Sequence, residues 1–486
     1  MAEDSAEHVD VLVVGAGISG IDAAWHLQRR CPGKTLLILE ARERIGGTWD
    51  LFRYPGVRSD SDMYTLGFPF RPWRGERSIV DGGAIRDYVE DTALAFGIDR
   101  RIRFRHKVVK ASWSTPKARW TVEVESEGES KRFSCAFLFL CSGYYDYAAG
   151  YRPEWPDEER FAGRIVHPQS WPDDLDHDGR RVVVIGSGAT AVTLVPAMAK
   201  KAAKVTMLQR SPSYVVSRPS IDRLARHIGP SLTRWKNLLL GIYFFDRARK
   251  KPAKVRQAIL RLAARALPPG YEVERHFSPS YDPWDQRLCL VPDSDLFEAI
   301  SDGKVEVVTD SIDRFTESGV RLASGREIEA DLVVTATGLV MKLMGGIQIL
   351  VDGQTVNPGS RFAYKGMMLS GVPNLALSFG YTNASWTLKC DLTSRWVCRL
   401  LRHMDRQGYA IAMPAQPRLT EPVPMLDFSS GYVRRAEAIL PKQGRRPPWR
   451  VHQNYLKDLL MLRLRPLADQ FLELRRTPPV QIHGPD

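Results

Sequence analysis

Two segments of the chain repeat one order of hydrophobic and polar positions: a short apolar run, a glycine-rich turn, a helical pattern and a second apolar run. The first run, the turn and the second run lie at 11–14, 15–20 and 36–39 in one segment, and at 182–185, 186–191 and 205–208 in the other. Short strands that alternate with helices are typical of βαβ units, which require a parallel sheet. The pattern therefore predicts an α/β protein with two Rossmann-like dinucleotide-binding domains.

The remaining pattern predicts more strands, a long helix and a helical insert. Strands are expected at 107–110, 120–125, 136–140, 304–309, 319–322, 332–335 and 375–379. A helix is expected from Trp386 to about Met404, and the helical region 223–267 places Val255, Ile259 and Leu262 on one face. We expect residues 1–145 to begin one dinucleotide domain and 336–486 to complete it with a C-terminal tail. Residues 146–335 form the other domain, with a basic helical insert at about 221–280.

The composition indicates a globular protein of two or three domains. Of 486 residues, 44% are hydrophobic, and this length exceeds a single core. Residues 1–10 are acidic and polar, unlike a secretory signal, and the longest apolar run, 238–245, is far shorter than the roughly 20 residues of a membrane span. None of the six cysteines forms a Cys-x-x-Cys pair, so no metal site or redox dithiol is indicated. The expected location is the cytoplasm.

The net charge of +13 is concentrated in the helical insert. Residues 221–266 contain twelve Lys and Arg residues against two Asp residues, a local charge of +10. A nucleic-acid-binding protein would not need to confine its charge to one insert, so no nucleic-acid partner is expected. Two interpretations stay open for the insert: a solvated helix face with its apolar side on the protein, or an amphipathic surface that contacts anionic membrane.

The first glycine turn has the spacing of a dinucleotide fingerprint. Gly15, Gly17 and Gly20 form G-x-G-x-x-G around Ala16. Gly15 allows the tight turn, Gly17 lets the backbone approach a pyrophosphate, and Gly20 lets helix and strand pack closely. The pyrophosphate is expected on the helix N-terminus. Glu40, at the end of the second strand, is expected to accept hydrogen bonds from ribose hydroxyls.

The second turn differs from the first in the charge that follows it. It reads Gly186-Ser187-Gly188-Ala189-Thr190-Ala191, and the next strand ends in Gln209-Arg210-Ser211. A carboxylate repels a ribose 2′-phosphate, whereas an arginine binds one bidentately, a contact of about 1.5–3 kcal/mol. Arg210 in place of Glu40 therefore predicts NADPH at the second turn and FAD at the first, with hydride passing between them. An ordinary solvated arginine at a strand end is the alternative.

Other motifs select among flavoproteins with two dinucleotides. A disulfide reductase needs a Cys-x4-Cys pair after the first unit, and residues 45–52 contain no cysteine. Instead, Gly46-Gly47-Thr48-Trp49, Tyr54-Pro55-Gly56 and Asp60 fit one Baeyer–Villiger signature, and Phe161-x-Gly163-x3-His167-x3-Trp171-Pro172 fits the second. The chain resembles the Baeyer–Villiger monooxygenases, which are class B flavoprotein monooxygenases. It is most similar to the ethionamide-activating members, through 58–64, 283–289 and 383–387.

The resemblance implies the chemistry and its residues. NADPH reduces FAD, O2 adds to give a flavin C4a-peroxide, and the peroxide converts a ketone to an ester or lactone; sulfides and thioamides are further expected substrates. Arg287 is implied as the cation beside the anionic oxygen, and Asp60 as the partner that orients it. One such contact at about 4 Å contributes roughly 4 kcal/mol at an effective dielectric near 20. A purely structural Asp–Arg pair is the alternative.

Further residues are expected around the cofactors. Thr48, Trp49 and Val109 are assigned to cofactor binding, as are Thr337 and Gly338 where the chain crosses between the domains. Trp49 either walls the cofactor cleft or belongs to the core. His167 is expected to be a hinge or hydrogen-bonding residue of the interdomain linker, not a general base.

Two other functions stay open. A flavin-containing monooxygenase that oxidises nitrogen or sulfur through an electrophilic hydroperoxyflavin would not need Arg287. A flavin-binding sensor or membrane scaffold would need neither Arg287 nor Asp60, and the presence of both, with two intact turns, argues against it.

Overall fold

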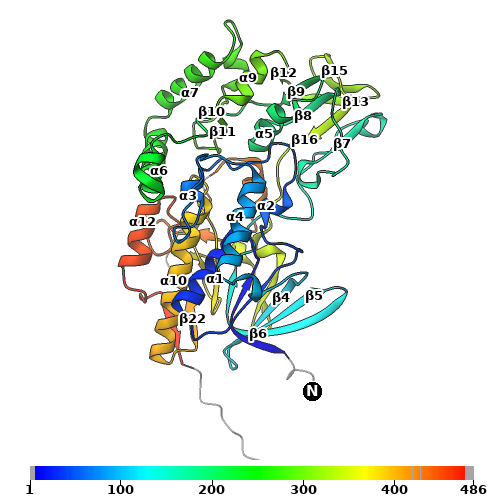
Figure 1. Cartoon of the computed structure of the whole chain (residues 1–486). Coiled ribbons are helices and arrows are strands. Elements are labelled where there is room, and N and C mark those ends of the chain that lie inside the picture. The colour runs from blue at the N-terminus through cyan, green and yellow to red at the C-terminus, as the bar shows by residue number, and fades with distance from the viewer. Residues whose placement is uncertain (1–5, 418–419, 427, 477–486) are drawn as a thin grey trace, which may run out of the picture.

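Two separate β-sheets organise the protein. The computed structural model describes residues 6–417, 420–426 and 428–476, with the larger sheet in the lower part of Figure 1 and the smaller one in the upper part. The smaller sheet uses strands from Arg164 to Thr335 only, whereas segments from before and after it build the larger sheet. We call the two parts the large-sheet domain and the five-stranded domain. The predicted α/β class with two Rossmann-like domains is confirmed.

The large sheet has the strand order β18-β17-β4-β5-β6-β1-β2-β3, and β21 also pairs with β6. At its centre β1 (Glu7–Val14) runs parallel to both β2 (Leu36–Leu39) and β6 (Glu129–Leu140). Every residue of β2 is buried, as expected for a parallel strand covered on both faces. The other strands are β3 (Ile102–Arg103), β4 (Lys107–Ser114), β5 (Arg119–Ser126), β17 (Gln348–Val351), β18 (Gln354–Thr355) and β21 (Leu375–Leu377).

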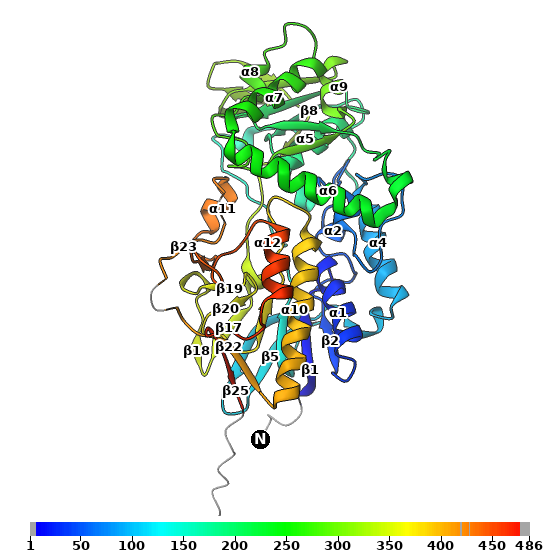
Figure 2. The ribbon, with the colours of Figure 1, turned by 90° about the vertical axis from the view of Figure 1, so that its left-hand side faces the viewer.

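Helices cover this sheet and direct their first turns toward the boundary between the domains. α1 (Ile18–Arg30) packs along α10 (Trp386–Gln407), and α4 (Gly82–Ala95) lies beside α1 (Figures 1 and 2). α10 ends at Gly408, whose φ of +68° is the left-handed conformation that glycine adopts most readily. Three short strand pairs attach the C-terminal segment: β19 (Ala363–Tyr364) with β20 (Met368–Leu369), β22 (Ile411–Pro414) with β25 (Leu472–Arg475), and β23 (Val423–Pro424) with β24 (Lys442–Gln443).

The five-stranded domain is entirely parallel in its main sheet. Its order is β12 (Val305–Thr309), β9 (Lys204–Gln209), β8 (Arg181–Ile185), β16 (Leu332–Thr335) and β7 (Arg164–Val166). α5 (Ala189–Met198) follows β8 directly and packs with α9 (Asp295–Ser301). A small antiparallel sheet of β13 (Ile312–Thr316), β14 (Gly319–Leu322) and β15 (Glu327–Glu329) extends the domain.

The helical insert consists of α6 (Ala225–Lys250), α7 (Pro252–Ala266) and α8 (Val273–Phe277), flanked by the paired strands β10 (Val215–Arg218) and β11 (Cys289–Pro292). α6 leaves the five-stranded domain and lies across the large-sheet domain, above α10 and α12 (Tyr455–Leu459) (Figure 2). The prediction for α7 was wrong at Leu262, which is exposed. Ala263, one residue further round the helix, is buried in its place, because the buried face turns with the 3.6-residue period. None of the described helices is long and apolar enough to cross a bilayer.

Candidate active site

A cavity of about 1150 Å³ lies where the two domains face each other. Both glycine turns open onto it, since each follows a parallel strand at its carboxyl end. The predicted site residues that line it are Gly15, Gly17, Glu40, Thr48, Trp49, Asp60, Gly186, Ser187, Gly188, Ala189, Thr190, Arg210, Ser211, Arg287, Thr337 and Gly338. Residues far apart in the sequence therefore meet in one space.

The first turn is shaped for close approach of a ligand to the backbone. Gly15 has φ +104°, and a Cβ there would lie 2.7 Å from the carbonyl oxygen of Cys141. A Cβ at Gly20 would overlap the carbonyl oxygen of Gly15. A Cβ at Gly17 would only approach Gly47 at 3.5 Å, so the missing side chain of Gly17 opens the cavity rather than relieving a clash. This open cradle at the start of α1 fits a pyrophosphate.

The carboxylate of Glu40 is fixed at the edge of the same turn. It accepts hydrogen bonds from the backbone N–H groups of Ala16 (2.6 Å) and Arg42 (2.9 Å). Burial raises the pKa of Glu40, and the two N–H groups oppose that rise. Glu40 also lines the cavity, and a carboxylate can accept more than two hydrogen bonds, which suits a ribose diol.

The second turn repeats this geometry with a cation in place of the carboxylate. Gly186 has φ +139°, and a Cβ there would overlap the carbonyl oxygen of Ala336, whereas nothing lies within 4 Å of a Cβ at Gly188. Ser187 donates to the carbonyl oxygen of Ser211 (3.0 Å). Arg210 is exposed at the cavity wall, and its guanidinium has no ion-pair partner among the described residues. A free cation in this position suits a 2′-phosphate.

Three predicted cofactor residues do not line the cavity within the described part of the chain: Ala16, Gly20 and Val109. Ala16 is buried and acts through its N–H, and Gly20 packs against Gly15. The pairing of β4 with β5 shifts register between Val108 and Lys110, and Val108 lines the cavity in place of Val109. A register irregularity of this kind changes which side chain faces inward and leaves no mark in the sequence pattern.

Arg287 and Asp60 form a two-point ion pair at the cavity. Arg287 Nη2 donates to Asp60 Oδ1 at 2.7 Å, and Nε lies 2.7 Å from Oδ2. The side chains keep 34% and 24% of their surface exposed, so part of the guanidinium stays open to the cavity. Burial acts to lower the pKa of Arg287, but the adjacent Asp60 carboxylate raises it above its ordinary value. Arg287 is thus a permanent cation.

Sequence reasoning missed the aromatic wall around this cation. Tyr144 and Tyr145 follow β6, their hydroxyls lie 3.0 Å apart, and Tyr432 of α11 (Gly431–Ala436) lines the same cavity. Burial raises the pKa of Tyr144 and of Tyr432, so these hydroxyls stay neutral donors. Tyrosines directly after Ser142-Gly143 were the available signal. No sequence signal pointed to Tyr432, because α11 belongs to the C-terminal segment and only the fold places it at the cavity.

The surroundings of Trp49 and of His167 answer two questions that the sequence left open: whether Trp49 lines the cavity or belongs to the core, and whether His167 could be a general base. Trp49 lines the cavity and also packs against the core of the large-sheet domain, so both interpretations apply. His167 Nδ1 accepts from the N–H of Gln169 (3.2 Å), and Nε2 lies 3.2 Å from the carbonyl oxygen of Gly338. Burial lowers the pKa of His167. These contacts tie the linker to the crossing strand and leave neither nitrogen free for proton transfer.

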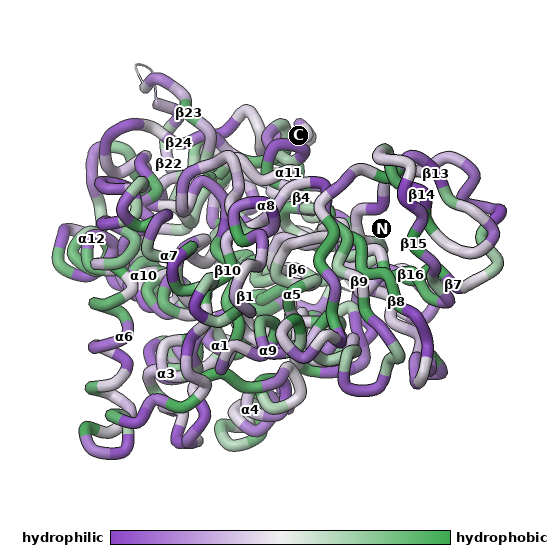
Figure 3. Tube along the Cα trace, turned by 90° about the horizontal axis from the view of Figure 1, so that it is seen from above, coloured by the Kyte–Doolittle hydropathy of each residue, from purple (hydrophilic) through white to green (hydrophobic). Residues whose placement is uncertain are grey.

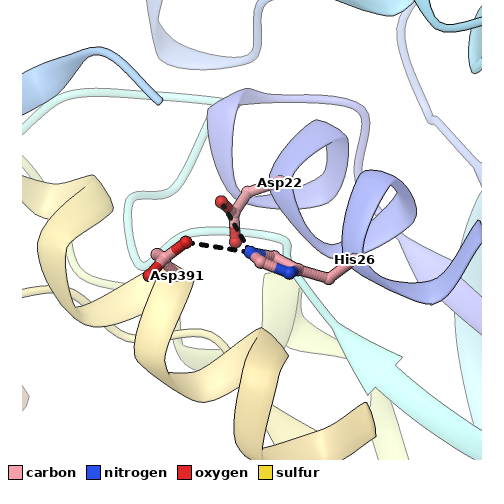
Figure 4. Close-up of side chains that lie close together, drawn as sticks. All are labelled: Asp22, His26 and Asp391. Carbon is pink, nitrogen blue, oxygen red and sulfur yellow. Dashed lines mark hydrogen bonds and ion pairs between the residues drawn. The ribbon is translucent and has the colours of Figure 1, made fainter. Parts of the chain in front are cut away.

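A second polar cluster lies between α1 and α10 (Figure 4), and its residues are not among those that line the cavity. His26 Nε2 is 2.9 Å from Asp391 Oδ1 and 3.8 Å from Asp22 Oδ1, and Arg30 donates to Nδ1 at 3.1 Å. Burial raises the pKa of Asp22 to about 7. The three ligand-type atoms lie within 4.8 Å of one another, but both imidazole nitrogens already have protein partners. The cluster therefore joins the two helices.

Two facing fingerprint turns in one cavity, one beside a carboxylate and the other beside a free arginine, define a flavoprotein oxidoreductase that uses a nicotinamide dinucleotide. The family description "Flavin-binding monooxygenase-like" matches residues 68–409, and "NAD(P)-binding Rossmann-like domain" matches residues 13–74. The chain belongs to the flavin-binding monooxygenase-like family.

Individual relatives agree with this assignment. The FAD-containing monooxygenase EthA of Mycobacterium tuberculosis is 56% identical over 482 residues, which are 97% of this chain and 99% of the relative. The probable FAD-binding monooxygenase AlmA of Acinetobacter baylyi is 46% identical and covers 93% of both chains. An oxidized steroid monooxygenase bound to NADP has 26% identity and a TM-score of 0.71, covering 84% of this chain and 88% of that one. The protein is an FAD-containing monooxygenase with FAD and NADP as cofactors, and the resemblance stated from the motifs is confirmed.

Proposed function

We propose that this protein is a Baeyer–Villiger monooxygenase that uses NADPH and O2 to convert ketones to esters or lactones. The observation that carries the proposal is the Arg287–Asp60 pair in a cavity shared by both glycine turns. A permanent cation with one open edge is what ketone oxygenation demands, because negative charge develops on the carbonyl oxygen when the carbonyl carbon is attacked. Oxidation of a nitrogen or sulfur atom develops no such charge on the substrate.

The residues present fit both cofactors, and each has an expected holder. The turn at Gly15 and Gly17 with Glu40 would hold FAD, and the turn at Gly186 and Gly188 with Arg210 would hold NADPH. When both are bound, FAD supplies the activation of O2 with a hydride taken from NADPH. By this division, the parts expected from the sequence at 1–145 and 336–486 would bind FAD, and the part at 146–335 would bind NADPH.

The chain's own groups then act on the substrate. Arg287 would bind the carbonyl oxygen and stabilise its developing charge, and Asp60 would hold the guanidinium in the orientation that points its free edge into the cavity. Tyr144, Tyr145 and Tyr432 would exclude water around that oxygen, which strengthens the charge contact. Removing one such preorganised donor costs about 10²–10³ in kcat in related chemistry.

The test is product analysis with the Arg287→Ala and Arg287→Lys variants. Cyclic, linear and aryl ketones, a thioether and a thioamide are supplied with NADPH to FAD-loaded protein. We expect about 10²–10³-fold less ester or lactone with Arg287→Ala, partial activity with Arg287→Lys, and NADPH oxidation in all forms. Unchanged lactone formation by Arg287→Ala would refute the proposal. Thioether oxygenation without ketone oxygenation by the unaltered protein would assign it instead to nitrogen and sulfur oxidation.

A further inference from the structure

The outward face of α6 carries a row of exposed apolar side chains. Nine of the fourteen exposed large hydrophobic residues among the described part of the chain lie in the helical insert. On α6, Leu232, Trp235, Leu239 and Tyr243 follow one another at spacings of three and four residues, and Leu240 and Phe244 form a second, neighbouring series. Leu232 and Tyr243 are each 61% exposed. Scattered apolar residues on a surface are ordinary, but a contiguous row marks an interaction site.

The inner side of α6 is anchored to the protein by its own contacts. Arg234 donates to the carbonyl oxygens of Tyr64, Thr65 and Gly67, and Asn237 donates to Asp62 at 3.0 Å. Leu238 packs against Tyr381 and Leu388. The inner side of α6 is thus held by polar and apolar contacts, whereas the outer side carries apolar side chains that are exposed.

The apolar surface continues onto the neighbouring C-terminal helix. The ring of Trp235 packs edge-to-face against Tyr455 of α12, with centroids 6.0 Å apart. The π-helical turn η6 (Leu460–Leu464) continues α12 and exposes Leu460 and Leu464, the latter by 69%. In Figure 2 α12 lies directly below α6, and Figure 3 shows α6 projecting from the edge of the molecule. We call the outer row of α6 together with Leu460 and Leu464 the α6 surface.

Basic side chains flank the α6 surface at both ends of the helix. Arg223 and Arg226 precede it, and the exposed residues Arg247, Lys250, Lys251 and Lys254 follow it. Asp246 and Glu76 offset part of this charge, through ion pairs with Lys250 and Arg226. These ion pairs, and the hydrogen bonds of Arg234 to backbone carbonyl oxygens, leave less free positive charge than the +10 counted from the sequence. The residues at the two ends of the α6 surface still carry a net positive charge. Two copies meeting through this surface would bring like charges together.

We propose that the α6 surface docks this protein on an anionic phospholipid bilayer. Exposed leucines and aromatic rings enter the interface between headgroups and acyl chains, and lysines and arginines beside them pair with anionic headgroups. The position of α6 adds a consequence that rests on the proposed function. Its inner side contacts Tyr381 and Ala384, which line the cavity. A docked enzyme would hold its active site one helix away from the lipid that dissolves apolar ketones.

The test is co-sedimentation of the full-length, FAD-loaded protein with vesicles. Equimolar phosphatidylcholine and phosphatidylglycerol is compared with phosphatidylcholine alone, at low and high salt. We expect binding to the anionic vesicles that weakens with salt. The triple variant Trp235→Ser, Leu239→Ser, Tyr243→Ser should bind at least about tenfold more weakly, and Lys250→Glu, Lys251→Glu, Lys254→Glu should lose the preference for anionic lipid.

Two control variants change exposed apolar or basic residues elsewhere on the protein. Leu94→Ser with Ile439→Ser removes exposed apolar side chains away from the α6 surface, and Lys200→Glu with Lys304→Glu reverses exposed charges. Both should bind vesicles as the unaltered protein does. Flavin absorbance and NADPH oxidation without vesicles show that each variant is folded, whatever its substrate. The proposal is overturned if the unaltered protein does not bind the vesicles or if the triple variant binds them equally well. It is also overturned if the unaltered protein is a dimer through this surface and the triple variant is a monomer.

Discussion

Arg287 and Asp60 are 227 positions apart in the sequence and form a two-point ion pair across the boundary between the domains. Asp60 belongs to the large-sheet domain, and Arg287 precedes β11 beside the helical insert. Because each comes from a different domain, the orientation of the guanidinium depends on how the domains sit together. The position of the guanidinium at the proposed reaction centre therefore depends on interdomain geometry. Nicotinamide binding between the domains would be able to change that position.

Asp60→Asn should lower ketone turnover without removing flavin. The amide can still accept a hydrogen bond from Arg287, but it supplies no counter-charge, so the guanidinium loses its fixed orientation. We expect kcat to fall about 10–100-fold, with FAD content and the KM for NADPH little changed. Steady-state kinetics with a cyclic ketone measures this. Asp285→Asn is the control, since Asp285 lies in the loop that contains Arg287 but pairs with the partly exposed Arg249 instead. An equal loss in both variants would remove the special role of Asp60.

Arg210→Ala should weaken NADPH selectively. The guanidinium is the free cation beside the second turn, and a charge-assisted contact to phosphate contributes about 1.5–3 kcal/mol. We expect the KM for NADPH to rise roughly 10–100-fold while the KM for NADH stays nearly constant. Initial rates of NADPH and NADH oxidation measure the ratio, with Lys201→Ala as an exposed cation outside the cavity. A parallel rise for both nucleotides would contradict a 2′-phosphate contact.

Alanine at three glycines should separate folding from cofactor binding. At Gly20 a Cβ overlaps the Gly15 carbonyl oxygen, so Gly20→Ala should yield little folded, flavin-loaded protein. At Gly17 and Gly188 there is room for a Cβ, so both variants should fold. Gly17→Ala should lose FAD affinity and Gly188→Ala should raise the KM for NADPH, because the methyl group enters the space of a pyrophosphate. Flavin absorbance per protein and NADPH kinetics report the outcome. Normal FAD content in Gly17→Ala would argue against the pyrophosphate position.

Asp22 should make stability fall as pH rises between about 4 and 7. Burial raises its folded pKa to about 7 from 3.8, so the folded protein holds a proton that the unfolded chain has released. The stabilisation is complete below the unfolded pKa and is lost as pH rises through the folded one. Asp22→Asn keeps an acceptor for Ser394 and mimics the protonated form. It should raise the free energy of unfolding at pH 8 by on the order of 2 kcal/mol and change little at pH 4.

Thermal unfolding of FAD-loaded protein over this pH range measures the Asp22 effect. Asp87→Asn is the control, because its side chain is 60% exposed. Identical pH profiles for the unaltered protein and Asp22→Asn would show that the Asp22 carboxyl is ionised in the folded protein at neutral pH.

The sequence by itself determined the parts that are local. Strand, glycine turn and helix follow one another within about thirty residues, so both βαβ units, the roles of Gly15 and Gly186 and the charge difference between Glu40 and Arg210 could be predicted from spacing. The signatures around Asp60 and His167 predicted the family because each is also a short, local pattern. β2 lies at the residues predicted, because a buried parallel strand is a continuous apolar run.

Only the tertiary structure decided which distant residues meet. The β4–β5 register irregularity put Val108 on the cavity in place of Val109, and the turn of α7 put Leu262 in solvent. Tyr432, from the C-terminal segment, lines the cavity. Arg234 lies on the inner side of α6 and bonds to the protein, whereas the outer side of the helix is exposed. Periodicity ranks the faces of a helix or strand, but what covers each face depends on long-range packing, which a local pattern does not contain.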